Sequence, residues 1–267
     1  MILAIDMGNS NIKIGVIAAE HDIIEERVTT ALNKTSMEYA MDILSILSFY
    51  KIDKRQIDGA ILASVVPPLT GTISTAVRKV LGFAPLIATN KLKLSVHFEH
   101  MKYPEKVGAD LVVGAEAAFR YFRTPVIIIN MGTATTITVV DSTGAYQGGV
   151  ILPGLRVSLN SLSNNAAQLP YISLESPGNA IADNTVDSMR SGILYGNAGQ
   201  IDGIIDRMEA ELGEPASLVA TGGLARFVVP HCRHQIKLDD ALLMRGLLLI
   251  YQNNEGGRRE DIGAAAE

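Results

Sequence analysis

The first residues of the chain combine an apolar strand with a cluster of groups that could bind phosphate. In order, these are Asp6, Met7, Gly8, Asn9, Ser10, Asn11, Ile12 and Lys13. A sharp turn at Gly8 would let backbone N–H groups approach a phosphate, because glycine has no Cβ and tolerates positive φ. The Asp6 carboxylate is a ligand of the type that holds hydrated Mg²⁺. The alternative is an ordinary hairpin with a turn-forming aspartate.

The same pattern occurs again near the middle of the chain. Residues 3–17 and 127–141 both run apolar strand, polar residue, glycine, small hydroxyl or amide residues and a second β-branched strand. Asn130 follows Asp6 by 124 positions, close to half of the 267 residues. Two similar lobes are therefore expected, whose hairpins would clamp a triphosphate, with the glycine pair 222–223 as a third point of close approach.

Other nucleotide-binding motifs are missing from the sequence. There is no G-x-x-x-x-G-K-[ST] loop, and no G-x-G-x-x-G lies between a strand and a helix. The sequence therefore excludes the P-loop and the dinucleotide-binding fingerprint and leaves the paired hairpins as the nucleotide site.

The composition of the chain indicates a globular protein and argues against nucleic-acid-binding and membrane proteins. With 48% hydrophobic and 19% charged residues, the chain can bury a large core. A net charge of -5 argues against a nucleic-acid partner. The single cysteine, Cys232, indicates a reducing compartment, so we expect a cytoplasmic protein. No membrane association is expected, because the uncharged stretch 59–77 contains two prolines and Asp6 interrupts the apolar start.

Strands and helices alternate along the chain, which is typical of an α/β fold. Helices are expected at 36–50, 69–81, 110–122, 157–164, 186–211 and 241–251, and strands at 2–5, 12–16, 59–66, 85–88, 126–130, 134–140, 145–150 and 217–221. We expect an N-terminal lobe at 1–123, a C-terminal lobe at 124–253 and a flexible tail at 254–267.

Six short motifs in a fixed order carry a family resemblance. They are D-x-G-N-S at 6–10, GAD at 108–110, GTATT at 132–136, GG-x-I-x-PG at 148–154, NT at 184–185 and TGG-x-A at 221–225. Together they resemble the type III pantothenate kinases, members of the actin-like, acetate and sugar kinase superfamily. The resemblance implies two actin-like (ribonuclease H-like) lobes with a central cleft. It also implies a homodimer that uses ATP with Mg²⁺ to convert pantothenate to 4'-phosphopantothenate, the first step toward coenzyme A.

The resemblance also implies roles for individual residues. Asp110 would be the general base, residues 6–13 and Thr133 would bind ATP, and Asp6 would hold Mg²⁺ through water. The pantothenate site would be lined by Tyr103, Gly108, Ala109, Asp110, Leu111 and Thr185, with Thr185 reaching across the dimer interface. Structural alternatives remain for each: Asp110 and Thr185 could cap helices, Lys13 could be a solvated strand residue, and Tyr103 could be a packing residue. The H-C-R-H segment at 231–234 is not interpreted as a zinc site.

Three positions depart from the family pattern. Asn130 stands where an aspartate helps to bind K⁺ or NH₄⁺, so a monovalent cation there would meet a neutral amide. Leu111 replaces the arginine of G-x-D-R, and Thr138 replaces a further aspartate. These changes keep two alternatives open: a catalytically silent paralogue that binds nucleotide and acts as a regulatory partner, or a kinase of another small hydroxylated acid or sugar.

Overall fold

A computed structural model describes residues 1–255, which divide into two compact units. Unit 1 comprises residues 1–95 and 102–117 together with the described residues from 241 onward; unit 2 comprises 96–101 and 118–240. The expected lobe boundaries differ from these units mainly in the last helix, α7 (Leu242–Glu255), which contacts β1, β2 and β4 of unit 1. Residues 254 and 255 of the expected tail continue α7, and the remainder of the tail lies outside the described residues.

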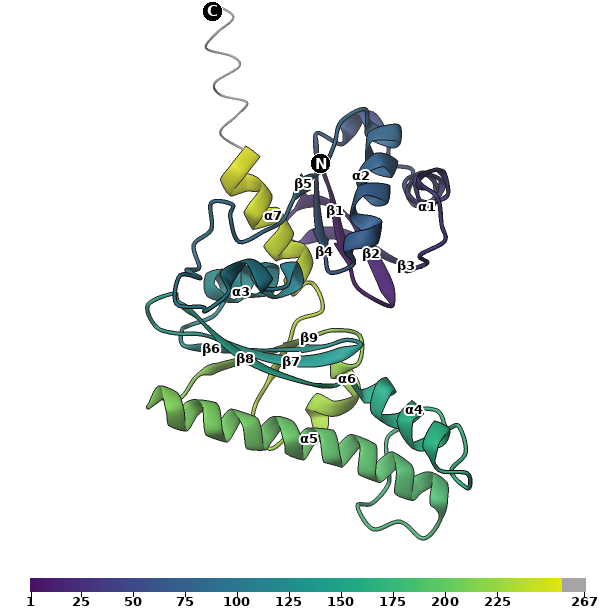
Figure 1. Cartoon of the computed structure of the whole chain (residues 1–267), viewed down its shortest axis with the longest axis vertical. Coiled ribbons are helices and arrows are strands. Elements are labelled where there is room, and N and C mark those ends of the chain that lie inside the picture. Colours follow the sequence, from purple (N-terminus) through teal and green to yellow (C-terminus); the bar gives the residue numbers. More distant parts are fainter. Residues whose placement is uncertain (256–267) are drawn as a thin grey trace, which may run out of the picture. The chain divides into compact units, whose positions relative to one another are not determined.

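Unit 1 is built on a five-stranded sheet in the order β3-β2-β1-β4-β5. The strands are β1 (Ile2–Met7), β2 (Asn11–Ala19), β3 (Asp22–Thr29), β4 (Gly59–Ser64) and β5 (Leu86–Ile87). β1 runs antiparallel to β2 and parallel to β4. One face packs against α1 (Ser36–Phe49) and α2 (Pro67–Leu81), and α7 lies on the other face, where Gly15 leaves room for Met244 (Figure 1).

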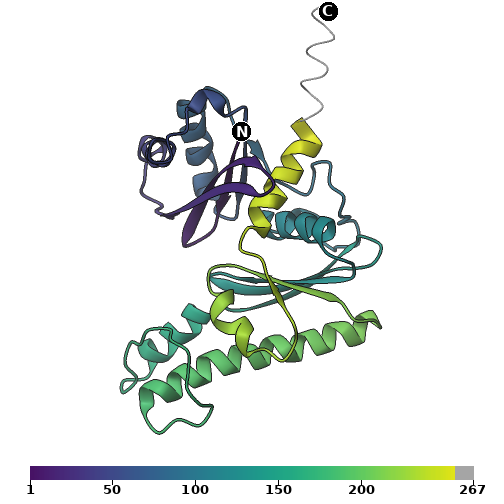
Figure 2. The same ribbon diagram turned by 180° about the vertical axis from the view of Figure 1, so that it is seen from behind.

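Unit 2 has a second five-stranded sheet, in the order β10-β9-β6-β7-β8. The strands are β6 (Val126–Met131), β7 (Ala134–Val140), β8 (Tyr146–Pro153), β9 (Ser217–Thr221) and β10 (Lys237–Leu238). Its core-bearing face packs against α4 (Leu155–Asn165), α5 (Thr185–Leu212) and α6 (Ala225–Val228), and α5 runs along the whole sheet (Figure 2). Matching β6 to β1, β7 to β2 and β9 to β4 gives the same order and the same directions. The α/β class and the duplicated pattern predicted from the sequence are confirmed.

The remaining elements are short, apart from α3 (Ala109–Tyr121), whose residues from 118 onward belong to unit 2. Three 3-10 turns are η1 (Lys54–Gln56), η2 (Pro104–Lys106) and η3 (Val229–His231). The expected helix at 69–81 begins earlier, at Pro67, because proline is tolerated in the first helical turn. Among residues 1–255, no helix is long and apolar enough to cross a bilayer.

The strand β3 was not predicted. Its sequence DIIEERVT contains four charged side chains, and it is one of the two edge strands of its sheet. Charge on an edge strand protects the sheet from further pairing, but it hides the apolar alternation by which a strand is recognised. The omission matters because β3 contributes charged groups to the face that carries Asp6.

Candidate active site

The β1–β2 hairpin holds the first predicted phosphate-binding segment. Gly8 N–H donates to the Asn11 carbonyl at 3.0 Å, and the Thr30 hydroxyl donates to the Gly8 carbonyl at 2.7 Å. Asn9, Ser10 and Asn11 are exposed at the tip of the turn. Met7 and Ile12, which pair just below the tip, belong to the core and anchor the hairpin there. Met7 and Ile12 are therefore core residues that hold the hairpin in place, and the exposed tip is the part that can contact a ligand.

Asp6 and Lys13 lie opposite each other on β1 and β2, on the face that also receives α7. Lys13 is only 9% exposed, so it is not a solvated strand residue. Its ammonium lies 3.4 Å from the Glu25 carboxylate of β3. Arg27 is the next residue in the same cross-strand row, and its guanidinium lies 3.6 Å from Glu25. The result is a charged cluster across three strands, in which the Glu25 carboxylate lies within 4 Å of both cations.

The pKa of Asp6 is raised to about 7. Burial is the main cause, and the charges of Asp110 and Glu25 raise the pKa further, while Lys13 and Arg27 oppose the shift. A divalent cation at this carboxylate would favour its ionised form, so the donor chemistry of Asp6 fits hydrated Mg²⁺. The influence of Asp110 on Asp6 also shows that the structure brings these two predicted residues together within unit 1.

Asp110 lies in the first turn of α3, which begins at Ala109. Its carboxylate accepts a hydrogen bond from the Leu111 N–H at 2.9 Å, and burial raises its pKa. A Cβ at Gly108 would lie 2.7 Å from the Asp110 carboxylate, so a side chain there would displace that carboxylate. The carbonyl of Gly108, just before the helix, accepts from the N–H groups of Leu111 and Val112, and the Asp110 carboxylate also accepts from the Leu111 N–H, so Asp110 satisfies a donor of the first turn as well. The same contacts hold the Asp110 carboxylate beside Gly108.

Two further residues of the predicted pantothenate site, Tyr103 and Thr185, lie in different units. Tyr103 precedes η2 in unit 1 and is 49% exposed, so it is not a packing residue. Thr185 is the first residue of α5 in unit 2, and the helix is capped by Asn184, whose side chain accepts from the Asp187 N–H at 3.0 Å. Thr185 is thus free of the capping role and borders a hollow of about 750 Å³. Polar and apolar side chains share its lining, among them Asn184, Ser188, Leu162 and Leu169.

The β6–β7 hairpin is one residue shorter than its counterpart. Asp6 pairs with Lys13, seven positions later, whereas Asn130 pairs with Thr136, six positions later. Thr133 is exposed at the tip, and its carbonyl accepts from the Gly154 N–H at 3.2 Å. A Cβ at Gly154 would overlap with that carbonyl. The turn that presents Thr133 is thus held by the backbone of the β8–α4 connection.

Gly222 has a different role from the one expected. It has a φ of +96°, and a Cβ there would overlap with the Met131 backbone at the end of β6. Gly222 is therefore needed for packing against the protein's own backbone. The space that its missing side chain leaves, which we expected a phosphate to approach, is occupied by Met131.

Asn130 lies in a row of neutral side chains. It pairs with Thr136 on β7 and with Thr221 on β9, so the three side chains share one face of the sheet. The hydroxyls of Thr136 and Thr221 are buried, and neither has a hydrogen-bond partner within residues 1–255. Buried hydroxyls are normally satisfied, so two orphaned oxygens beside an amide indicate a missing polar ligand. Oxygen donors of this kind fit a monovalent cation or water.

Four residues beside these sites were missed in the sequence: Glu25, Arg27, Thr221 and Val65. Glu25 and Arg27 were missed with strand β3, although their spacing of two residues places them on one face of any strand. Thr221 was quoted in a motif without a role, because its position beside Asn130 depends on long-range strand pairing. Val65 has no recognisable chemical signal in the sequence.

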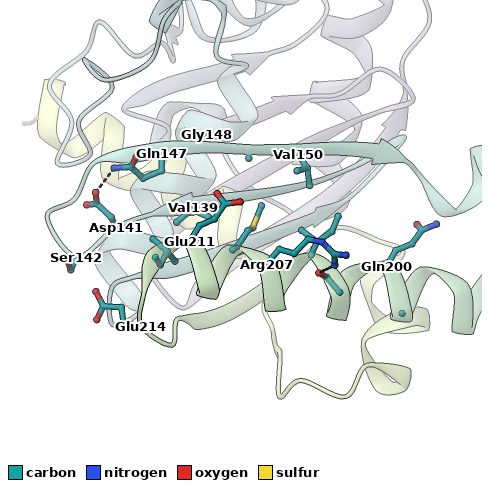
Figure 3. A pocket seen from close by; sticks show the side chains of 16 residues that line it. Val139, Asp141, Ser142, Gln147, Gly148, Val150, Gln200, Arg207, Glu211 and Glu214 are labelled. Carbon is teal, nitrogen blue, oxygen red and sulfur yellow. Dashed lines mark hydrogen bonds between the residues drawn. The ribbon is translucent and has the colours of Figure 1, made fainter.

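A second hollow, of about 1000 Å³, lies between β8 and α5 (Figure 3). Its polar lining includes Asp141, Gln147, Gln200, Arg207 and Glu211. Gln147 donates to Asp141, and Arg207 donates to the Gly203 carbonyl at 2.6 Å, so both groups already have partners (Figure 3). None of the predicted catalytic or binding residues borders it, which separates it from the candidate active site.

Known proteins provide independent comparisons. The family model described as type III pantothenate kinase matches residues 2–207. A type III pantothenate kinase from Exiguobacterium sp. is 38% identical over 255 residues, covering 96% of this chain and all of the relative. One from Moorella thermoacetica is 38% identical over 256 residues, covering 95% of this chain and all of that relative.

Solved structures support the fold. A Campylobacter jejuni protein described as a Baf family transcriptional activator superposes with a TM-score of 0.60 at 18% identity, covering 94% of this chain and 97% of that one. A 2-dehydro-3-deoxygalactonokinase-like protein from Sinorhizobium meliloti gives 0.54 at 11% identity, covering 94% and 96%. The predicted actin-like fold is confirmed. The extent of the sequence matches, over nearly the whole length, shows that the chain belongs to the type III pantothenate kinase family.

Proposed function

We propose that this protein transfers the γ-phosphoryl group of ATP to the primary hydroxyl of pantothenate, giving 4'-phosphopantothenate and ADP. The observation that carries the proposal is that Asp6 and Asp110 both lie in unit 1, where the charge of Asp110 raises the pKa of Asp6. Two carboxylates beside an exposed glycine turn match the needs of phosphoryl transfer, which are alignment and charge neutralisation.

Asp110 is the general base in this proposal. The hydroxyl proton moves to its carboxylate while the hydroxyl oxygen bonds to the γ-phosphorus and the bond to the ADP oxygen breaks. Burial raises the pKa of Asp110, which makes it a better proton acceptor when ionised. The Leu111 N–H and the tight corner at Gly108 keep the carboxylate oriented.

Asp6 and the hairpin tips bind ATP. Asp6 would hold Mg²⁺ through water, and this ion would neutralise phosphate charge when bound. The exposed residues Asn9 to Asn11 would contact the phosphates with amide and hydroxyl donors. Thr133, exposed on the second hairpin, would contact the same nucleotide.

A coupled assay for ADP release tests this function. Asp110→Asn should lower kcat by about 10²–10⁴-fold, because a positioned base contributes that much, while leaving the KM for ATP within about threefold. Asp22→Asn, at an exposed carboxylate of β3, is the matched control and should retain full activity. Unchanged turnover in Asp110→Asn would remove the base from the mechanism.

The neutral row around Asn130 supports two further tests. A monovalent cation held by Asn130, Thr136 and Thr221 would make turnover depend on K⁺ or NH₄⁺ and fail with Na⁺. Equal rates in all three ions would reject that cation site.

The replacement of two family carboxylates also favours, as a second candidate, a silent nucleotide-binding paralogue. Nucleotide binding by calorimetry, without phosphoryl transfer to pantothenate or to a panel of related hydroxy acids and sugars, would support it.

Thr185 would complete the pantothenate site of a second copy in a homodimer. Asp110 belongs to unit 1 and Thr185 to unit 2, and in the proposed homodimer each site would take Asp110 from one chain and Thr185 from its partner. Asp110→Asn and Thr185→Val should each be inactive alone, and mixing them should restore about a quarter of the wild-type activity by random exchange between symmetric dimers. A mixture that stays inactive, or a monomer in light scattering, contradicts the shared site.

A cytoplasmic location, where ATP and reduced thiols such as Cys232 are maintained, is part of this proposal.

A further inference from the structure

Residues 102–106 place two ammonium groups over one aromatic ring. Lys106 Nζ lies 4.4 Å and Lys102 Nζ 5.3 Å from the centroid of the Tyr103 ring. Both lysines are exposed, as is half of the tyrosine. Cations over an aromatic face are held by its quadrupole without losing their charge. We refer to these three residues as the Tyr103 cluster.

The cluster is supported by a well-fixed turn. Lys106 N–H donates to the Tyr103 carbonyl at 3.1 Å, and Val107 N–H donates to the Pro104 carbonyl at 3.0 Å. The Asn90 side chain donates to the same Pro104 carbonyl at 2.6 Å, which ties the turn to the segment after β5. The lysine stems therefore start from an ordered backbone, which reduces the entropy lost when they bind a ligand.

The positive charge of the cluster is not neutralised by a neighbouring acid. Within residues 1–255, neither Lys102 nor Lys106 forms an ion pair with a carboxylate, and Glu105 between them in sequence forms none. Lys13 and Arg27, the cations nearest to Asp6 in the sheet, are both within 4 Å of Glu25. Two ammonium groups close to one ring repel each other, so an anion within reach of both would be attracted by both.

The separation between Lys106 and Asp110 along the chain is compatible with the length of pantothenate. Lys106 precedes Asp110 by four residues, so their Cα atoms are at most about 14 Å apart. Eight bonds separate the reacting hydroxyl oxygen of pantothenate from its carboxylate carbon, about 9 Å when extended. A substrate with its hydroxyl at Asp110 can therefore place its carboxylate within reach of the lysine side chains.

Leu111 offers no cation at the start of α3 for the acid end of pantothenate. Its side chain is apolar, and its N–H is used by the Asp110 carboxylate. We propose that Lys102 and Lys106, held around Tyr103, bind the carboxylate of pantothenate and give the enzyme its preference for an acceptor with a terminal acid. The inference rests on the proposed function and deepens it, because it assigns the specificity for one end of the substrate.

Steady-state kinetics with two acceptors test the assignment. Pantothenol has the same reacting hydroxyl but an alcohol in place of the carboxylate. In Lys102→Gln/Lys106→Gln, the KM for pantothenate should rise about three- to tenfold, as expected for two exposed ion pairs, with kcat unchanged. The KM for pantothenol should stay within about twofold of the wild-type value, because that acceptor has no charge to lose.

The control is Lys54→Gln/Lys79→Gln, which removes two charges from exposed lysines elsewhere in unit 1. A similar rise in the KM for pantothenate in this control, or an equal rise for both acceptors in the cluster variant, would overturn the inference while leaving the kinase activity established. If the wild-type enzyme turned over neither acceptor, the proposed function would fail. Calorimetry with pantothenate would then decide the inference alone, since the cluster variant must still bind it about three- to tenfold more weakly than the wild type does.

Discussion

The two hairpins share a strand order but differ in chemistry. In unit 1 the row across the sheet is Ala63, Asp6 and Lys13, with charged groups continuing on β3. In unit 2 the corresponding row is Thr221, Asn130 and Thr136, all neutral. The turn of unit 2 is also one residue shorter. The same backbone pattern can therefore support a charged metal-binding row and a neutral oxygen row, because strand pairing does not depend on the side chains of the solvent-facing or ligand-facing positions.

The largest expected effect comes from making the first row as neutral as the second. Asp6→Asn should lower kcat by about 10³-fold, close to 4 kcal/mol, because a group that neutralises transition-state charge is lost. Asn130→Ala should lower kcat by less than about tenfold. ADP release at saturating ATP and pantothenate measures both. Similar losses in the two variants would show that the rows share one role.

The second prediction concerns the pH dependence of stability. The pKa of Asp6 is about 7 in the folded chain, against 3.8 for an unperturbed aspartate, so folding favours its protonated form. Its contribution to stability is full below about pH 4 and is lost as the pH rises through 7, by about 2–4 kcal/mol. Urea unfolding of Asp6→Asn should show a stability gain over the wild type that grows between pH 4 and 8. A constant difference would contradict the shifted pKa, and Asp22→Asn serves as the exposed control.

The third prediction compares the supports of the two turns. Gly154→Ala should destabilise unit 2 by about 2–3 kcal/mol, because the new Cβ overlaps with the Thr133 carbonyl. Gly8→Ala should destabilise unit 1 by about 1 kcal/mol or less, since its Cβ would lie 3.1 Å from the Asn11 carbonyl. Hydrogen exchange of β6–β7 and β1–β2 peptides separates the two effects. Equal losses of protection would mean that both turns are packed alike.

The smallest expected effect comes from adding charge to the neutral row. Asn130→Asp places a carboxylate between two threonine hydroxyls, so it should bind K⁺ more tightly than the amide does. The K⁺ concentration that gives half-maximal turnover should fall by about tenfold, or 1.4 kcal/mol. Titration of K⁺ in the ADP-release assay measures it. An unchanged K⁺ response would place the cation, if one is used, away from residue 130.

Much of the fold could be predicted from local patterns. Apolar runs, glycine turns and helical spacing gave the α/β alternation and the repeated hairpin, because both depend on neighbouring residues. β3 escaped prediction because its Glu and Arg side chains interrupt the apolar alternation of an edge strand. The position of α7 in unit 1 also escaped, because only its contacts with β1, β2 and β4, far away in the sequence, assign it to that sheet.

By itself, the sequence determined the chemistry available: an aspartate before the first hairpin turn, another in the first turn of α3, a neutral amide in the second hairpin, and the family to which the motifs belong. Only the tertiary structure decided which side chains meet. Strand register placed Thr221 beside Asn130 and Lys13 beside Asp6, and burial raised the pKa of Asp6. The physical reason is that pairing and desolvation depend on contacts between residues far apart in the chain, which local sequence patterns do not encode.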